Sequence, residues 1–210
     1  MAKHTVTCGT QPITLDAIQE RLRRIYAAIG QTAPVALKQS DMRQQILKTP
    51  DGVLLAWHMD FDFGRSEAEL MNAAMTAINN IAVFRGYCTP YGLSHGISKR
   101  EIGRVVDDCL ALKIIIDLHN IEKHPATPGN MSRLNPRLQR VSQAPYFVEG
   151  KGSIEFNPST GETKLVGDVK VIVVGSIVDA KTSAQIAELG PMLDEGLAAW
   201  EAFLTKHHIV

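Results

Sequence analysis

The sequence predicts a mainly α-helical (α+β) fold, in which a helical bundle carries a small antiparallel β-meander inserted before the C-terminal helix. Apolar residues recur at intervals of three and four over much of residues 14–124, which is the spacing of amphipathic helices. Valine, isoleucine and phenylalanine then concentrate within residues 146–179, as they do in strands. A helical pattern returns over about residues 182–206. With 210 residues, we expect one domain that spans residues 1–210.

Thr14 opens the first predicted helix, which ends near Gly30. Threonine is a favoured N-cap residue because its hydroxyl accepts a hydrogen bond from the first turn. The helical pattern then weakens: residues 41–47 suggest a short helix, residues 50–52 a turn, and the alternation in residues 53–63 a short strand or an extended loop. The buried positions of the first helix are Ile18, Leu22, Ile25 and Ile29.

Two capping boxes mark the starts of the central helices. Residues 66–69 (SEAE) and 98–101 (SKRE) each place a serine at the N-cap and a glutamate three positions later, so that both side chains satisfy backbone N–H groups. The first of these helices is expected to end near Gly86, before a glycine-rich loop at residues 88–96. The second is expected to run unbroken until Pro125 stops it, because the residue before a proline is disfavoured in the α conformation.

The chain changes character after this proline. Residues 125–145 contain four prolines, which predicts an ordered loop. Strands are predicted at residues 146–156 and 163–179, with a hairpin turn at residues 157–161 between them. Gly167 and the aspartate after it can split the second strand, which would give a three-stranded meander.

The last predicted helix covers about residues 182–206, with Thr182 or Ser183 at its start. Gly190-Pro191 is expected to kink it. Its apolar stripe consists of Ile186, Leu189, Leu193, Leu197, Trp200 and Leu204.

The composition argues against a broad nucleic-acid-binding surface. Lysine plus arginine equals aspartate plus glutamate, 22 against 22, so the chain lacks the positive field that drives non-specific binding to nucleic acid. The three cysteines, Cys8, Cys88 and Cys109, form no CxxC pair and suit a reducing compartment. The N-terminus lacks the apolar stretch of a signal peptide, and no apolar run is long enough to span a bilayer. We therefore expect a cytoplasmic protein with no membrane contact.

A polar cluster, DLHNIEKH, ends the long central helix at residues 117–124. On a regular helix His119 and His124 point roughly 140° apart, so the two imidazoles do not form a helical metal pair. The cluster has two interpretations. It is either a polar helix end, whose Lys123 and His124 complement the negative end of the helix dipole, or a chemical site.

The chemical interpretation comes from a resemblance. Residues 66–124 resemble the HEPN superfamily, small helical bundles whose functional signature is an arginine, four to six further residues and a histidine. The segment from His119 to His124 fits this signature in its spacing, its polar second residue Asn120 and its closing histidine, but His119 stands in place of the arginine. The resemblance extends to bacterial proteins with HEPN-like helices in which strands follow the motif.

This resemblance implies a metal-independent endoribonuclease of the toxin or phage-defence type, without a cofactor, which acts on RNA as a homodimer. It assigns His124 to acid–base catalysis, since imidazole titrates near neutrality, and Asn120 to a supporting role. His119 takes the place of the missing cation, and three downstream arginines are candidates to bind phosphate. The alternative is a non-catalytic HEPN-like homodimeric module in which the same residues are structural. The candidate phosphate ligands are Arg133, Arg137 and Arg140.

Two other motifs contain residues with chemical potential. His58, Asp60 and Asp62 alternate, so a strand would place all three on one face, where they could bind magnesium, manganese or zinc. A solvated strand face is the simpler interpretation. His95 lies in the glycine-rich loop between the capping boxes, but no partner is evident for it in the sequence.

Overall fold

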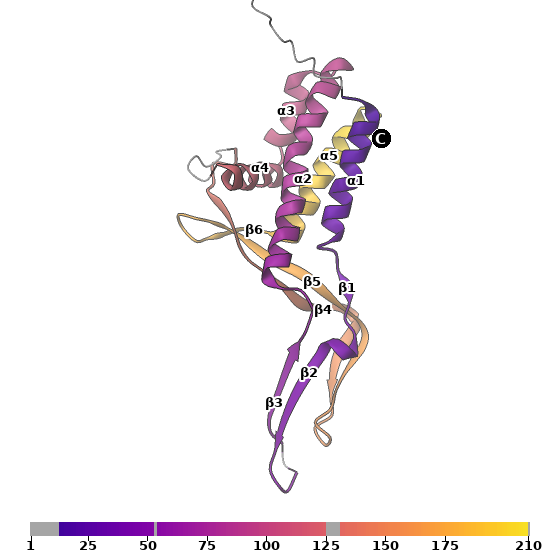
Figure 1. Ribbon diagram of the computed structural model, residues 1–210, viewed down its shortest axis with the longest axis vertical. Coiled ribbons are helices and arrows are strands. Elements are labelled where there is room, and N and C mark those ends of the chain that lie inside the picture. Colours follow the sequence, from indigo (N-terminus) through magenta and orange to yellow (C-terminus); the bar gives the residue numbers. More distant parts are fainter. Residues whose placement is uncertain (1–12, 53, 125–130, 210) are drawn as a thin grey trace, which may run out of the picture.

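The computed structural model describes residues 13–52, 54–124 and 131–209, and it corrects the predicted fold class. The chain is a mixed α+β protein, not a mainly helical bundle: 47% of it is helix and 30% is strand, and the strands form two antiparallel sheets. The molecule is elongated, with the helices at one end and two β-hairpins projecting from the other (Figure 1). We call this projection the arm; it consists of residues 42–61 and the turn-side parts of the long hairpin, residues 146–156 and 163–170.

Helix α1 (Leu15–Gly30) begins and ends as predicted. The Thr14 hydroxyl accepts a hydrogen bond from the Ala17 N–H at 3.3 Å. Ile18 and Ile25 are fully buried because they lie on the face that packs against α2 (Glu67–Ser94). The predicted N-cap thus sets the start of α1.

Helix α2 begins at its predicted capping box but does not end near Gly86. It continues through Pro90 to Ser94, so the predicted loop at residues 88–96 is largely helical. The continuation is stabilised by burial, since Cys88 and Tyr91 are 2% and 8% exposed. Gly92 permits the close approach of the next helix, because a Cβ atom at this position would lie 2.8 Å from Ile102 Cδ1.

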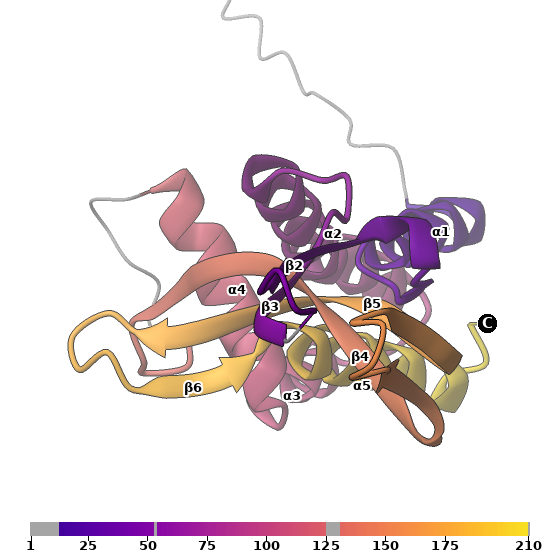
Figure 2. The same ribbon diagram turned by 90° about the horizontal axis from the view of Figure 1, so that it is seen from below.

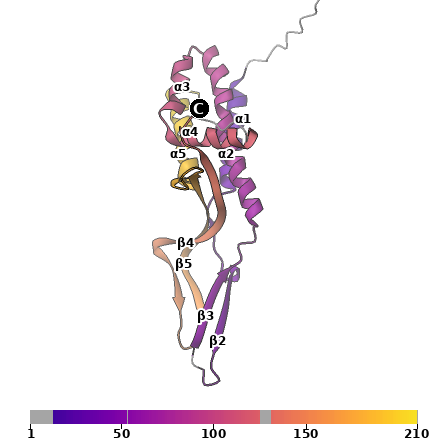
Figure 3. The same ribbon diagram turned by 90° about the vertical axis from the view of Figure 1, so that its left-hand side faces the viewer.

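The predicted unbroken helix over residues 98–124 is two helices, α3 (Lys99–Asp107) and α4 (Leu110–Lys123). Between them, the Cys109 thiol accepts a hydrogen bond from the Leu112 N–H at 3.5 Å and so caps α4. The break turns α4 across the bundle (Figures 1 and 3). Pro125, which was predicted to stop the helix, lies outside the described residues.

The larger sheet contains more of the chain than predicted. Its strands are β1 (Val35–Ala36), β4 (Pro136–Phe156), β5 (Thr163–Asp179) and β6 (Gln185–Glu188), in the order β1-β5-β4, with β6 also paired to β5. All pairings are antiparallel. The sheet crosses the lower end of the bundle (Figure 2). The predicted hairpin between residues 146–156 and 163–179 is confirmed.

Three local predictions around this sheet are wrong. Residues 136–145 are the first half of β4 and not a loop, because they pair with residues 171–179 of β5. Residues 185–188 form a strand, so the last helix, α5 (Leu189–Lys206), begins seven residues later than predicted. The predicted kink at Gly190-Pro191 is the third. Pro191 lies in the first turn of α5, where a missing N–H removes no helical hydrogen bond and so does not interrupt the helix.

Gly167 does not split β5. It adopts φ +75°, and a Cβ atom there would lie 1.7 Å from the Lys151 carbonyl oxygen. The glycine therefore allows the two strands to stay paired through an irregularity in their register, which lies between Phe147 and Gly152 on β4.

The second sheet is a hairpin of β2 (Met42–Lys48) and β3 (Leu54–Phe61), preceded by a short 3-10 helix, η1 (Gln39–Asp41). The predicted helix at residues 41–47 is wrong, whereas the predicted strand after it is confirmed. Side-chain amides tie this hairpin to β5: Gln39 donates to the Thr163 carbonyl at 3.0 Å and accepts from the Leu165 N–H at 2.9 Å. The Gln39 side chain thus makes two hydrogen bonds to β5 of the kind that the backbone of a neighbouring strand would make.

Two apolar clusters stabilise the structure. The main core lies between the helices and the face of the larger sheet, where the buried Trp200 ring meets Phe84 edge-on at 5.6 Å. A small second cluster lies where the arm joins the bundle, and consists of Leu37, Val169 and Val171 with Phe61, Phe63 and Leu165 packed against them. None of the helices described is both long and apolar enough to cross a membrane.

Candidate functional site

The polar end of α4 is the site that the sequence proposes, and Asp117 is its most buried member. The Asp117 side chain is fully buried and accepts three hydrogen bonds: from the Met131 N–H at 2.9 Å, the Ser132 N–H at 2.8 Å and the Ser132 hydroxyl at 2.6 Å. All three donors lie where the chain approaches β4. Asp117 therefore anchors the chain entering the sheet to the helical bundle.

His119 is also engaged inside the fold. Its side chain faces α2, it is 9% exposed, and its Nδ1 lies 2.6 Å from Asn79 Oδ1. The Asn79 amide nitrogen donates to Glu122 at 2.9 Å, so the amide oxygen is the acceptor and His119 donates from Nδ1. Burial lowers the pKa of His119, with a further contribution from Lys123. A neutral imidazole cannot supply the positive charge that the family signature places at this position.

His124 lies apart from this buried network, and Asn120 is half-buried. His124 is exposed at the C-cap of α4, and its backbone N–H donates to the Asn120 carbonyl at 2.8 Å. His119, in contrast, packs against the neighbouring helix. The two histidines of the predicted pair thus have different surroundings, one buried and one in solvent, and α4 does not bring them into a common cleft.

The three candidate arginines are exposed and belong to β4 and the segment before it. Arg133 has φ +59°, and Arg137 is opposite Val178 in the sheet. Arg140 has φ +29° at the register irregularity between Gln139 and Val141. Within residues 13–52, 54–124 and 131–209, none of the three donates a hydrogen bond to the polar end of α4 or forms an ion pair there.

The alternating motif of β3 is a solvated strand face. His58, Asp60 and Asp62 are all exposed, the Asp60 carboxylate accepts from the Phe61 N–H at 2.8 Å, and Asp62 pairs with Arg43. In the part of the chain that is described, no three histidine, cysteine, aspartate or glutamate side chains converge as metal ligands. These residues therefore do not form the predicted alternative metal site.

His95 and the cysteines also have structural surroundings. His95 is the C-cap of α2, where its ring stacks on Tyr91 at 4.1 Å and its Nδ1 lies 2.8 Å from the Tyr91 carbonyl oxygen. Cys88 and Cys109 are buried free thiols, and burial raises the pKa of Cys88 to about 12, which makes it a poor nucleophile. Cys8 and the predicted absence of a signal peptide concern residues 1–12, outside the described residues.

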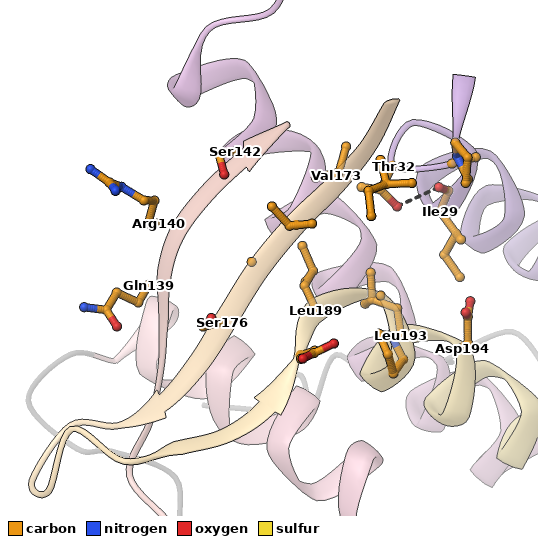
Figure 4. A pocket seen from close by; sticks show the side chains of 18 of the residues that line it. Ile29, Thr32, Gln139, Arg140, Ser142, Val173, Ser176, Leu189, Leu193 and Asp194 are labelled. Carbon is orange, nitrogen blue, oxygen red and sulfur yellow. Dashed lines mark hydrogen bonds between the residues drawn. The ribbon is translucent and has the colours of Figure 1, made fainter. Parts of the chain in front are cut away.

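A large hollow lies elsewhere, beside β5. It has a volume of about 960 Å³ and lies between the end of α1, the sheet and the start of α5 (Figure 4). The sequence gives no local signal for this groove, because its walls come from four separate parts of the chain: residues 29–34, 139–142, 172–176 and 185–194. Its labelled lining residues include Ile29, Thr32, Val173, Ser176, Leu189 and Leu193.

Comparison of the chain with protein-family models, with curated proteins and with solved structures finds no match. The HEPN resemblance therefore rests on the motif at residues 119–124 and on the helical pattern before it.

Proposed function

We propose that the chain is a non-catalytic interaction module that associates with a second copy of itself through the arm. The observation that carries this proposal is the structural use of the polar end of α4. Asp117 holds the chain that enters β4, and His119 holds α2 through Asn79. A module of this kind needs a stable fold and a surface that binds a partner, and the polar end of α4 contributes to the stability of the fold.

The ribonuclease alternative requires two groups that the polar end does not supply together. A proton-transfer group must reach the 2′-hydroxyl, and a cation must contact the charge that develops on phosphorus. His124 is accessible for the first role. His119 is buried with a lowered pKa and does not fulfil the second. Loss of one such contact costs about 3–4 kcal/mol of transition-state stabilisation, so the geometry favours the non-catalytic hypothesis.

The arm contains the apolar surface that self-association needs. Ten large hydrophobic side chains are exposed among the described residues, and five of them lie on the arm. Exposed aromatic and aliphatic side chains gathered on one projection are typical of interaction sites. The five residues are Ile46, Leu47, Tyr146, Phe147 and Phe156.

The outer edge of β4 in the arm supplies the main-chain contacts. Among the strands of the described residues, β4 pairs with β5 alone, so its other edge presents N–H and C=O groups to another strand. If two copies of β4 pair antiparallel around Ser153, Lys151 of each copy lies opposite Glu155 of the other. Both residues are exposed, and the chain has no net charge to oppose self-association. Such a pairing is self-complementary, as a two-fold interface requires.

The oligomeric state of the full-length chain tests this proposal. We expect light scattering after size exclusion to give a dimer. Lys151→Glu or Glu155→Lys alone places like charges opposite each other, so each should weaken the dimer roughly tenfold or more. The double variant restores opposite charges across the interface and should restore the dimer.

The double variant is a strict control because of the register within the hairpin. Glu155 is opposite Lys164 of the same chain, whereas Lys151 falls in the register irregularity and has no assigned partner on β5. Glu155→Lys therefore adds a like-charge pair within each arm, so recovery of the dimer in the double variant cannot come from a more stable arm. A wild-type monomer at all concentrations refutes the proposed dimer. Cleavage of single-stranded RNA by the wild type, and not by His124→Ala, refutes the non-catalytic hypothesis in favour of the ribonuclease.

A further inference from the structure

The second edge of β5 is interrupted. On this edge β1 pairs with Lys170 and Val171, and β6 pairs with residues 176–178. Between these two partners, residues 172–175 of β5 face no strand among those described. The exposure follows the same pattern: Val171 and Ile177 are 4% and 0% exposed, whereas every residue from 172 to 176 is half-buried. The sheet therefore has a gap about four residues long.

The backbone of Val173 points into this gap. The Leu37 N–H donates to the Val169 carbonyl at 2.9 Å, so the polar groups of Val169 face the edge that β1 occupies. The polar groups of alternate residues in a strand point the same way, and Val171 and Val173 follow Val169 at intervals of two. Pro145, which has no N–H, is opposite Val171. Because Pro145 has no N–H to donate, the Val171–Pro145 pair suits a position where the polar groups of Val171 face away from β4 and toward β1.

The fold keeps its own strands out of the gap. β1 starts at Val35, directly after Pro34, and β6 ends at Glu188, where α5 begins. The groove beside β5 opens at this place, between the end of α1 and the first turns of α5 (Figure 4). The Thr32 hydroxyl, which lines the groove near the end of α1, donates to the Ile29 carbonyl at 2.8 Å and so already has a hydrogen-bond partner.

The chemistry of the gap selects an extended peptide. One residue of an added strand can accept from the Val173 N–H and donate to its C=O, while its neighbours place side chains against apolar walls. Ile29, Leu189 and Leu193 supply these walls. Glu188 and Asp194 are exposed on the α5 side, whereas Arg140 lies across the sheet on β4 (Figure 4). The ligand should therefore have apolar residues next to lysine or arginine.

We propose that this gap binds an extended, positively charged peptide segment of a partner protein, which completes the interrupted edge of β5. The site is separate from the arm and does not depend on self-association. The same binding is therefore expected in Lys151→Glu, whether or not that variant is a monomer.

The capped peptide KVTVK is the probe; its central VTV lies opposite residues 172–174, and its terminal lysines need not pair with β5. We expect its titration into the ¹⁵N-labelled full chain, up to about 1 mM, to move the amide resonance of Val173 downfield. The amide of Ile172 points toward β4 and should move less. N-methylation of the central threonine of the peptide removes its donor and should weaken binding about tenfold. The peptide EVTVE should bind several-fold more weakly than KVTVK, because it meets Glu188 and Asp194.

Two variants test the backbone contact. Val173→Pro removes the N–H that faces the gap and no N–H that pairs with β4, so β4–β5 pairing should survive and peptide affinity should fall at least tenfold. Val173→Thr keeps the N–H and should bind within about twofold of the wild type. If Val173→Pro unfolds, the N-methylated peptide alone decides. Absence of a Val173 shift at the highest concentration, or equal affinity of the methylated and unmethylated peptides, overturns the proposal.

Discussion

Replacement of Asp117 by alanine should destabilise the whole fold. The carboxylate is fully buried and is the acceptor for two backbone N–H groups and one hydroxyl in the segment just before β4. Alanine leaves the Met131 and Ser132 donors without an acceptor in a place that water does not readily reach. A hydrogen bond to a charged group contributes about 1.5–3 kcal/mol, and an unsatisfied buried donor costs about 1–3 kcal/mol.

The expected size of the effect follows from these contacts. Three lost hydrogen bonds would sum to more, but partial relaxation and entry of water reduce the loss, so we expect about 3–5 kcal/mol. For a chain of this length, 1 kcal/mol shifts the melting temperature by about 2–4 °C. Asp117→Ala should therefore melt roughly 6–20 °C below the wild type. Asp117→Asn should not be more stable than Asp117→Ala, because the NH₂ group of asparagine would face hydrogen-bond donors of Met131 or Ser132.

The assay is thermal unfolding followed by circular dichroism, with urea titration for the free energy of unfolding. Asp107→Ala is the matched control: this aspartate is exposed on α3, so its removal should change stability by less than about 0.5 kcal/mol. If Asp117→Ala melts within a degree or two of the wild type, the buried anchor contributes little. The structural explanation of the α4 cluster would then be wrong.

Two other measurements test the buried histidine and the arm. Because burial lowers the pKa of His119, the unfolded chain binds a proton that the folded chain does not, and stability should fall as pH drops below about 6.5. Urea titrations at neutral and mildly acidic pH should give a smaller decline for His119→Gln than for the wild type; equal declines would contradict this. Gly167→Ala should disrupt the arm because its Cβ would lie 1.7 Å from the Lys151 carbonyl oxygen, whereas Gly150→Ala, also at positive φ but with open space around it, should be milder. Amide hydrogen exchange of the arm measures both, and equal protection in the two variants would rule out the steric argument.

Local signals predicted the starts of α1, α2 and α3, but not those of α4 and α5. Ser66 and Glu69 form the expected capping box, and Thr14 caps α1, because a cap involves residues within four positions of each other. The predicted ends were less accurate. α2 continues past Pro90 because the burial of Cys88 and Tyr91 against other elements outweighs local preference.

Strand content was the main error of the sequence-based prediction. Residues 42–47 and 185–188 were predicted to be helical, yet they pair with β3 and β5. Their apolar patterns are short and compatible with either structure. The choice depends on whether an open strand edge is available, and such an edge comes from distant parts of the chain.

The sequence by itself determined the N-caps of α1, α2 and α3 and the central hairpin of the larger sheet, since each depends on neighbours along the chain. Only the tertiary structure decided the role of the polar helix end and the position of the groove. Asn79 meets His119 from 40 residues away, and Gln39 meets Thr163 from 124 residues away. A polar side chain acts through the partner that it reaches, and long-range packing selects that partner.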